Sequence, residues 1–257
     1  MKRVRSICLF ILVTLPLGVI ASEFPYRSEY PDVKTIELSE LRAMMTEVDI
    51  VDVRSKLEFD VLHVKGAKHI TLSNKGFENK VKKLISNSKA IVFYCNGITC
   101  RKSYVAAQRA MAVGVNNVVA FDGGVFSWAE VYPQDSILLG ATLDDKNKII
   151  SNDKFDEHLL EPSDFKEQAS NSETLVVDVR DPIQRDILIF TNVGSRNIPI
   201  ERFESFLKTQ SKDQKIMIYD AVGKQVQWLQ YILEGQGYSN YYFMKDGVEG
   251  FVEAGLQ

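Results

Sequence analysis

The segment DIVDVR at residues 49–54 decides the fold, because it returns as LVVDVR at residues 175–180. Two further segments return in the same order: AIVFYC at 90–95 as KIMIYD at 215–220, and NVVAFDGGV at 117–125 as NYYFMKDGV at 240–248. The copies lie 123–126 residues apart, much further than the roughly 20–50 residues of solenoid repeats. The chain therefore contains a duplicated domain.

Strand-like and helix-like segments alternate within each copy. Short apolar runs at 50–53, 91–94 and 118–121 are typical of buried strands. Helical patterns at 77–85 and 103–113 separate them, and Gly114 follows the second as a natural helix stop. This alternation predicts an α/β fold in which each domain is a parallel sheet flanked by helices on both faces.

The first 22 residues have the pattern of a signal peptide. Basic residues at positions 2, 3 and 5 precede an apolar stretch at 7–20, and Val19 and Ala21 supply small residues before Ser22. The stretch is shorter than the about 20 residues that span a bilayer comfortably. We expect export to the periplasm and no stable membrane insertion after signal removal, the alternative being an uncleaved N-terminal anchor.

These observations divide the 257 residues into four parts. They are a signal peptide at 1–22, a first domain at 31–135, a linker at 136–157 and a second domain at 158–257.

Composition narrows the classes of function. A charged fraction of 25%, a net charge of −3 and a pI near 5.7 are ordinary for a soluble protein and predict no nucleic-acid partner. The histidines at 63, 69 and 158 are too scattered for a metal site, so we expect no metal and no cofactor.

The number and positions of the cysteines indicate a chemical role and not a structural one. Cys8 leaves with the signal peptide, so that the mature chain keeps only Cys95 and Cys100, too few for a disulfide framework. Both lie in the loop after the strand at 91–94, and ligands of such sheets bind beyond the carboxyl ends of the strands.

That loop has the features of an anion site. Its backbone N–H groups, the following helix N-terminus and the charges of Arg101 and Lys102 all favour a thiolate, so we expect a lowered pKa and a nucleophilic sulfur at Cys95. Gly97 is expected to turn the loop with a positive φ. Cys95 and Arg101 are the predicted catalytic residues. The predicted substrate-binding residues are Asn96, Gly97, Ile98, Thr99, Cys100 and Lys102, with Cys100 also a possible redox partner of Cys95.

Several motifs together resemble the rhodanese family. They are DVR at 52–54, Glu58-Phe59, HVKGA at 63–67 with Ile70, Tyr94-Cys95, Ser103, GGV at 123–125 and Trp128. The resemblance covers residues 31–135 and, more weakly, 158–257. It implies a sulfurtransferase that takes sulfane sulfur from a small anion such as thiosulfate, holds it as a persulfide on Cys95 and passes it to a thiol or protein acceptor.

The sequence departs from the family in two places. Five residues separate Cys95 from Arg101 where rhodaneses commonly have four. Five is the spacing of related phosphatases and arsenate reductases, although these have histidine where Tyr94 stands. Asp220 replaces the cysteine in the second copy and Thr191 replaces His63, which resembles the inactive domain that completes the cleft in tandem rhodaneses. A cysteine-dependent phosphatase or arsenate reductase, and a sulfur carrier without turnover, remain alternatives.

Overall fold

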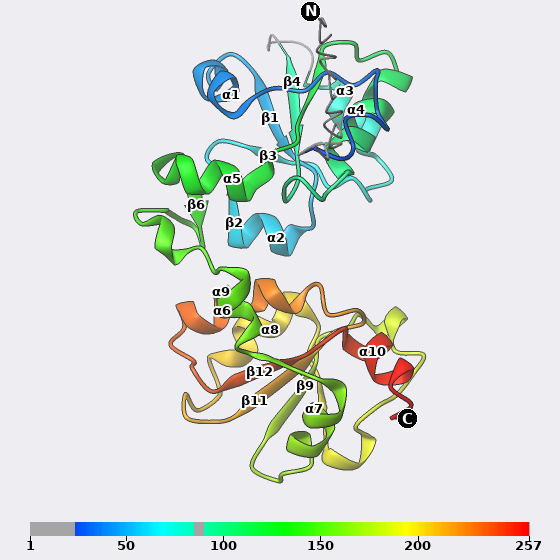
Figure 1. Ribbon diagram of the computed structural model, residues 1–257, viewed down its shortest axis with the longest axis vertical. Helices are drawn as coiled ribbons and strands as arrows, with labels where there is room; N and C mark the ends of the chain where they lie inside the picture. Colours follow the sequence, from blue (N-terminus) through cyan, green and yellow to red (C-terminus); the bar gives the residue numbers. More distant parts are fainter. Residues whose placement is uncertain (1–23, 85–89, 257) are drawn as a thin grey trace, which may run out of the picture.

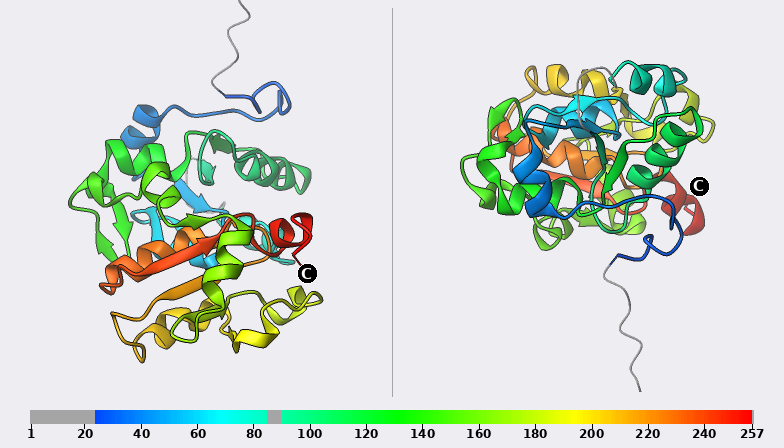
Figure 2. Two further views of the ribbon diagram at one scale, coloured as in Figure 1. Left: turned by 60° about the horizontal axis from the view of Figure 1, so that its bottom comes forward. Right: turned by 90° about the horizontal axis from the view of Figure 1, so that it is seen from above.

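In the computed structural model, which describes residues 24–84 and 90–256, the chain forms two α/β domains. Figure 1 shows the first domain in its upper half and the second, coloured yellow-green to red, below it. Figure 2 shows the two domains packed closely against each other. The predicted signal peptide at 1–22 lies outside the described residues.

The first domain is built on a parallel sheet with the order β3-β1-β4-β5. Its strands are β1 (Asp49–Asp52), β3 (Lys68–His69), β4 (Ile91–Tyr94) and β5 (Val118–Phe121). Its helices are α1 (Leu38–Met44), α2 (Lys56–Val61), α3 (Phe77–Lys82), α4 (Lys102–Ala112) and α5 (Gly124–Val131). Asp52 pairs with Tyr94 and Tyr94 with Phe121, so these three strands end at one level.

Both faces of this sheet are covered. Successive strand residues point to opposite sides, so Ile50 and Val92 pack with α1 and α5 while Val51 and Phe93 pack with α3 and α4. Gly114, with φ of +86°, follows the end of α4 as predicted.

The second domain repeats this plan with one more strand. Its parallel sheet has the order β10-β9-β11-β12-β8. The strands are β8 (Leu159–Leu160), β9 (Leu175–Asp178), β10 (Arg196–Asn197), β11 (Ile216–Tyr219) and β12 (Tyr241–Met244). The helices are α7 (Pro162–Ala169), α8 (Ile200–Leu207), α9 (Val226–Gly235) and α10 (Gly247–Glu253), and short 3-10 turns lie at η3 (Pro182–Gln184) and η4 (Thr191–Val193). The predicted fold class is confirmed.

The segment predicted as a linker, 136–157, has secondary structure of its own. It contains β6 (Ser136–Leu138), β7 (Ala141–Thr142), η2 (Lys146–Lys148) and α6 (Asn152–Asp156), and η1 (Pro133–Asp135) precedes it. β6 pairs antiparallel with β2 (Leu62–Val64) and with β7, which gives a small three-stranded sheet. The start of this segment is therefore part of the first domain's structure.

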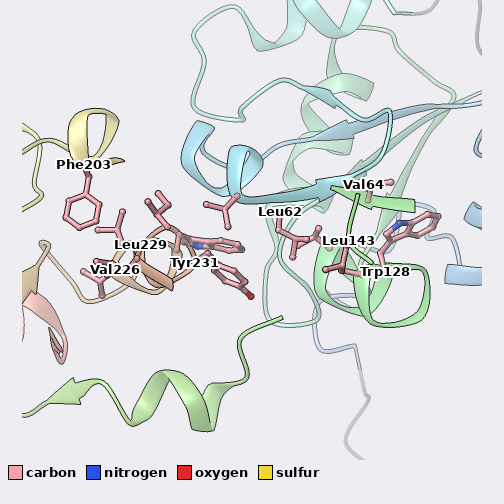
Figure 3. Packing of buried hydrophobic residues seen from close by; sticks show 14 of the residues in the cluster. Leu62, Val64, Trp128, Leu143, Phe203, Val226, Leu229 and Tyr231 are labelled. Atoms are coloured by element: carbon pink, nitrogen blue, oxygen red, sulfur yellow. The ribbon is translucent and has the colours of Figure 1, made fainter. Parts of the chain in front are cut away.

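One hydrophobic cluster crosses from the first domain into the second. Figure 3 shows Leu62, Val64, Trp128 and Leu143 on one side, and Phe203, Val226, Leu229 and Tyr231 on the other. The ring of Phe126 in α5 stacks on that of Trp228 in α9, with centroids 5.5 Å apart. The domains therefore share a core. Among the described residues no helix is both long and apolar enough to cross a membrane.

Candidate active site

The loop after β4 brings the predicted site residues together at the carboxyl end of the first sheet. Cys95 directly follows the buried strand β4, and α4 begins at Lys102 with Arg101 as its N-cap residue. The N–H of Val125 donates to the Cys95 carbonyl at 2.9 Å, which ties the loop to α5. The site therefore lies where the geometry of parallel sheets predicts it.

Cys95 lies below the surface. Its side chain is 0% exposed, and its Sγ donates to the Cys100 carbonyl at 3.0 Å and lies 3.9 Å from the Ser103 Oγ. Burial raises the pKa of this thiol well above its usual value, and the neighbouring Cys100 side chain raises it further. The expected lowered pKa of Cys95 is wrong, because burial of the sulfur disfavours its ionised form.

Cys100 has the properties that the sequence assigned to Cys95. Its side chain is only partly buried. A hydrogen bond from the Cys95 side chain, with further hydrogen bonds from the backbone N–H groups of Lys102 and Asn96, lowers the pKa of Cys100 to about 6 although burial opposes the shift. The pKa values of the two thiols are thus shifted in opposite directions.

The two basic residues after the cysteines differ in their effect. The positive charge of Lys102 contributes to the lowered pKa of Cys100. Arg101 is exposed, and its guanidinium makes no hydrogen bond or ion pair with any described residue. The anion-binding role of Arg101 stays a prediction, and its guanidinium is exposed at the start of α4.

Residues outside the loop contact its middle part, from Gly97 to Thr99. The Thr99 carbonyl accepts a hydrogen bond from the Tyr26 hydroxyl at 3.4 Å, and Ile98 is partly buried. Gly97 does not have the positive φ expected of it. Gly97 instead allows the loop to lie close to the start of α5, because a Cβ on Gly97 would lie 3.2 Å from the Gly123 carbonyl oxygen. In the same way, a Cβ on Gly124 would lie 2.4 Å from the Gly97 nitrogen.

Asn96 connects the loop to two buried charges. Its Oδ1 accepts from the Arg54 Nη1 at 3.0 Å and its Nδ2 donates to the Glu58 Oε1 at 2.9 Å. Arg54 in turn makes a fully buried ion pair with Asp52, with Nη2 and Oδ2 2.7 Å apart. In the first copy Asp52 and Arg54 thus hold the loop in position, and in the second copy a matching buried ion pair forms between Asp178 and Arg180.

Glu58 was not among the predicted site residues, although it lies in a motif quoted above. Burial, the largest influence, raises the pKa of Glu58, but the charge of Lys102, hydrogen bonds from Ser55 and the charge of Arg54 outweigh it and leave the pKa lowered. A charged Glu58 therefore faces Asn96 at neutral pH.

Trp228 was missed entirely. Its ring, from α9 of the second domain, lies 5.3 Å from the guanidinium carbon of Arg54 and is 2% exposed. The available signal was the sequence of α9, VQWLQYILEG, which is apolar around most of its circumference and so predicts burial on more than one side.

The sequence profile of the Rhodanese-like domain matches this chain twice, at residues 37–131 and 161–254. The chain belongs to the Rhodanese-like domain family.

Individual relatives of this rhodanese-like protein are distant. It is 23% identical over 121 residues, 47% of its length, to the Mycobacterium tuberculosis protein named Probable adenylyltransferase/sulfurtransferase MoeZ, and spans 30% of that protein. It is 30% identical over 125 residues, 48% of its length, to the uncharacterized Bacillus subtilis protein YqhL, spanning 92% of that protein. The crystal structure of a thiosulfate sulfurtransferase from Pseudomonas aeruginosa matches 88% of this chain and 43% of its own, with 17% identity and a TM-score of 0.41.

The second rhodanese-like domain has a closed loop at the equivalent place. Asp220 Oδ1 accepts from the N–H groups of Val222 at 3.1 Å and Gly223 at 2.5 Å, and Oδ2 accepts from Gln225 at 2.6 Å. Burial raises the pKa of Asp220 in spite of these donors. The loop's own carboxylate therefore accepts from the N–H groups that face it.

The histidines of this rhodanese-like protein have backbone partners. The Nδ1 of His63 lies 2.6 Å from the Phe59 carbonyl, the Nε2 of His69 3.0 Å from the Arg54 carbonyl, and the Nδ1 of His158 2.8 Å from the Tyr241 carbonyl. No group of three potential metal ligands is found within 24–84 and 90–256.

A cavity of about 590 Å³ lies between the two rhodanese-like domains. It is lined by α2 residues including Ser55, Lys56 and Asp60, and by residues of the second domain including Glu201 and Gln225. The described residues of the loop at 95–102 are not among its lining. The second domain reaches the loop indirectly, because its Trp228 ring contacts Arg54, and Arg54 holds Asn96.

Proposed function

We propose that this protein is a sulfurtransferase that moves sulfane sulfur from thiosulfate or a similar donor to a thiophilic acceptor. The sulfur is carried as a persulfide on the thiol pair in the loop after β4. The observation that carries the proposal is this pair of free thiols just before α4, at the carboxyl end of the sheet in a rhodanese-like domain.

The surroundings of the loop suit a sulfur anion. A persulfide is an anion, and the N–H groups of Asn96 and Lys102 and the positive end of the 11-residue helix α4 favour negative charge there. Lys102 adds a full positive charge beside the sulfur. These groups stabilise both the attacking thiolate and the persulfide that follows it.

Distant relatives support the same class of activity. The name of MoeZ includes sulfurtransferase, and the Rhodanese-like profile covers both domains of this chain. A sulfurtransferase acting through the first domain is consistent with the carboxylate that closes the second loop.

The test is transfer of sulfur from thiosulfate to cyanide, followed as thiocyanate, beside hydrolysis of a generic phosphate ester and reduction of arsenate. We expect thiocyanate to form and the other two reactions to stay at the level of the variant Cys95→Ser, Cys100→Ser. Phosphatase or arsenate reductase activity without thiocyanate would contradict the proposal. Loading of one sulfur without turnover in the presence of thiols would instead show a carrier.

We further propose that the protein acts outside the cytoplasm, with the periplasm as the compartment. The support is the basic and apolar sequence of residues 1–22, followed by small residues at a spacing suited to signal peptidase. Fractionation of cells expressing the full chain, with mass measurement of the mature N-terminus, tests this. Full-length protein found only in the cytoplasm would contradict it.

A further inference from the structure

Residues 24–33 lie before the first match of the Rhodanese-like profile, which begins at residue 37. Figure 1 shows this segment in dark blue, leading past α4 to α1. Its side chains contact α4, the turn between β5 and α5, and the loop after β4. This segment, the N-terminal strap, is therefore attached to the elements that surround Cys95.

The strap packs on the first turn of α4 through aromatic rings. The ring of Tyr30 stacks on that of Tyr104 with centroids 5.2 Å apart, and the ring of Tyr26 meets it edge-on at 6.5 Å. Tyr104 is 1% exposed and follows Ser103, whose Oγ lies 3.9 Å from the Cys95 Sγ. The strap therefore covers the turn of α4 that borders the cysteine.

The strap also makes an ion pair with a buried carboxylate. The Arg27 Nε and Nη2 donate to the two oxygens of Asp122 at 2.8 and 3.1 Å, and Nη2 also contacts the exposed Glu37. Asp122 is 3% exposed and accepts a further hydrogen bond from the Tyr104 hydroxyl. This two-pronged contact thus ties the strap to α4 and to the end of β5 at once.

These contacts lie on both sides of the loop after β4. Asp122 directly precedes Gly123 and Gly124, and the N–H of Val125 in α5 donates to the Cys95 carbonyl at 2.9 Å. In the middle of the loop the Tyr26 hydroxyl donates to the Thr99 carbonyl at 3.4 Å. The strap therefore restricts the loop at its middle and at the two helices that flank it.

The second copy lacks the residues that the strap contacts. Beyond the loop the copies are offset by 123 residues, as the matching glycines at 114 and 237 show with φ of +86° and +81°. Tyr104 then aligns with Gln227 and Asp122 with Lys245, which pairs with Glu161 on the surface at 2.6 Å. The second domain thus forms the same strand, loop and helix without this buried carboxylate, so the fold itself does not require it.

We propose that Tyr26 and Arg27 of the strap are positioning residues for sulfur transfer, acting through Thr99, Tyr104 and Asp122 on the loop that carries the cysteines. This inference rests on the proposed sulfurtransferase function. A nucleophile must be held in line with the atom it attacks, and small displacements of its support slow the reaction. The strap contacts occur in the copy that keeps the cysteine, which is where such support is needed.

The experiment measures transfer of sulfur from thiosulfate to cyanide at a temperature where circular dichroism shows every variant folded. We expect Arg27→Ala to lower kcat about tenfold or more, because a displacement of about 1 Å can cost up to about 100-fold in rate. Arg27→Lys should recover part of the rate, since it keeps the charge without the two-pronged contact. Tyr26→Phe, which removes one hydrogen bond, should lose about threefold.

Hydrogen exchange followed by mass spectrometry separates positioning from general stability. Arg27→Ala should speed the exchange of backbone amides at residues 95–104 about tenfold or more and leave residues 220–227 unchanged. The matched control is Arg42→Ala, which removes the ion pair between Arg42 and Asp135 at 2.7 Å. This control should keep both the wild-type rate of transfer and the wild-type exchange of the loop.

The outcomes distinguish this inference from the proposed function. If wild type forms thiocyanate and Arg27→Ala is no slower than Arg42→Ala, the inference is wrong and the function stands. Slower transfer with unchanged exchange at residues 95–104 would also overturn it, because the loop would then not depend on the strap. Should Arg27→Ala fail to fold, Tyr26→Phe decides by the same two measurements. If wild type itself forms no thiocyanate, the proposed function fails and this inference fails with it.

Discussion

At the scale of single residues, the site depends on which of two sulfurs is ionised. Cys95 and Cys100 share one loop, and both sulfurs have backbone N–H partners: Ser103 for Cys95, and Asn96 and Lys102 for Cys100. The Cys95 thiol donates its hydrogen to the Cys100 carbonyl at 3.0 Å, and burial raises the pKa of Cys95. Ionisation of the pair is therefore a property of the loop conformation as well as of the residue types.

Alkylation should show this difference directly. At pH 7 we expect iodoacetamide to modify Cys100 rapidly and Cys95 slowly, with the rate at Cys100 falling as the pH drops through about 6. The midpoint should stay low in Cys95→Ser, because a hydroxyl donates a stronger hydrogen bond than a thiol, and should rise toward the ordinary value of about 8.5 in Cys95→Ala, which has no donor. Peptide mapping by mass spectrometry across a pH series measures both. Equal labelling of the two cysteines at pH 7 would contradict the assignment.

Asn96 offers a second test at this scale. Replacing it with alanine removes the hydrogen-bond partners of Arg54 Nη1 and Glu58 Oε1, both on largely buried side chains. We expect Asn96→Ala to lower the free energy of unfolding by about 1–3 kcal/mol, because buried charged groups lose a partner. Urea denaturation measures this, and the exposed Asn192→Ala is the control. A variant as stable as that control would show that water replaces the amide at no cost.

At the scale of elements, the loop is fitted against the start of α5. A Cβ on Gly124 would lie 2.4 Å from the Gly97 nitrogen, and the residue has a φ of +69°. Gly247 has the same role in the second copy, where a Cβ would lie 2.6 Å from the Asp220 carbonyl. The repeated glycine at the start of α5 and α10 is thus required by the close approach of backbone to backbone.

Two glycines separate the effect of φ from the effect of crowding. Gly114 also has a positive φ, +86°, but a Cβ there meets nothing within 4 Å. We expect Gly114→Ala to cost roughly 1–2 kcal/mol from the backbone alone. Gly124→Ala should cost about 1–3 kcal/mol more, since the loop must move. Thermal unfolding of both variants measures the two losses of stability. Equal losses would show that the loop moves away from the added Cβ at no cost.

The closed loop of the second domain gives a prediction about stability. Asp220→Ala leaves the N–H groups of Val222, Gly223 and Gln225 without their acceptor, so the free energy of unfolding should fall by about 2 kcal/mol or more. Asp220→Asn, which keeps one acceptor oxygen, should lose less. Asp213→Ala changes an exposed carboxylate and serves as the control. An equal free energy of unfolding in Asp220→Ala and Asp213→Ala would show that water replaces the carboxylate as acceptor for these N–H groups.

The strands could be predicted because buried parallel strands are continuous apolar runs. The predicted segments 91–94 and 118–121 coincide with β4 and β5. β6 could not be predicted, since its three residues lack a pattern of their own and pair with β2 only through the folded domain. Likewise, the sequence locates Cys95 and Cys100 in the site, but which N–H groups lie near each sulfur depends on the turn from Gly97 to Cys100.

At the scale of the whole molecule, the second domain supports the first through a shared core. Trp228 contacts both Phe126 and Arg54, and Arg54 holds Asn96 in the loop. The sequence predicted an inactive second domain that completes the site. It could not predict that the contact runs through Trp228, because interdomain packing is set by the arrangement of the two folded units.

Replacing Trp228 tests this support. We expect Trp228→Ala to lower the free energy of unfolding by about 3–5 kcal/mol, the usual cost of removing a buried tryptophan. The variant should also lose sulfur transfer more than Trp228→Phe, which keeps a ring against Arg54. Calorimetry and the thiocyanate assay measure the two effects. If Trp228→Ala keeps wild-type stability, the ring contributes nothing to joining the domains.

The shared hydrophobic cluster also determines what a cut in the chain would do. Residues 144–148, between the two domains, are all exposed and so accessible to proteases. Leu62 and Trp128 precede them and Leu229 follows them, and all three belong to one cluster. A single nick there should therefore yield two fragments that elute together under native conditions and separate only in denaturant. Each fragment would bury apolar side chains of the other fragment.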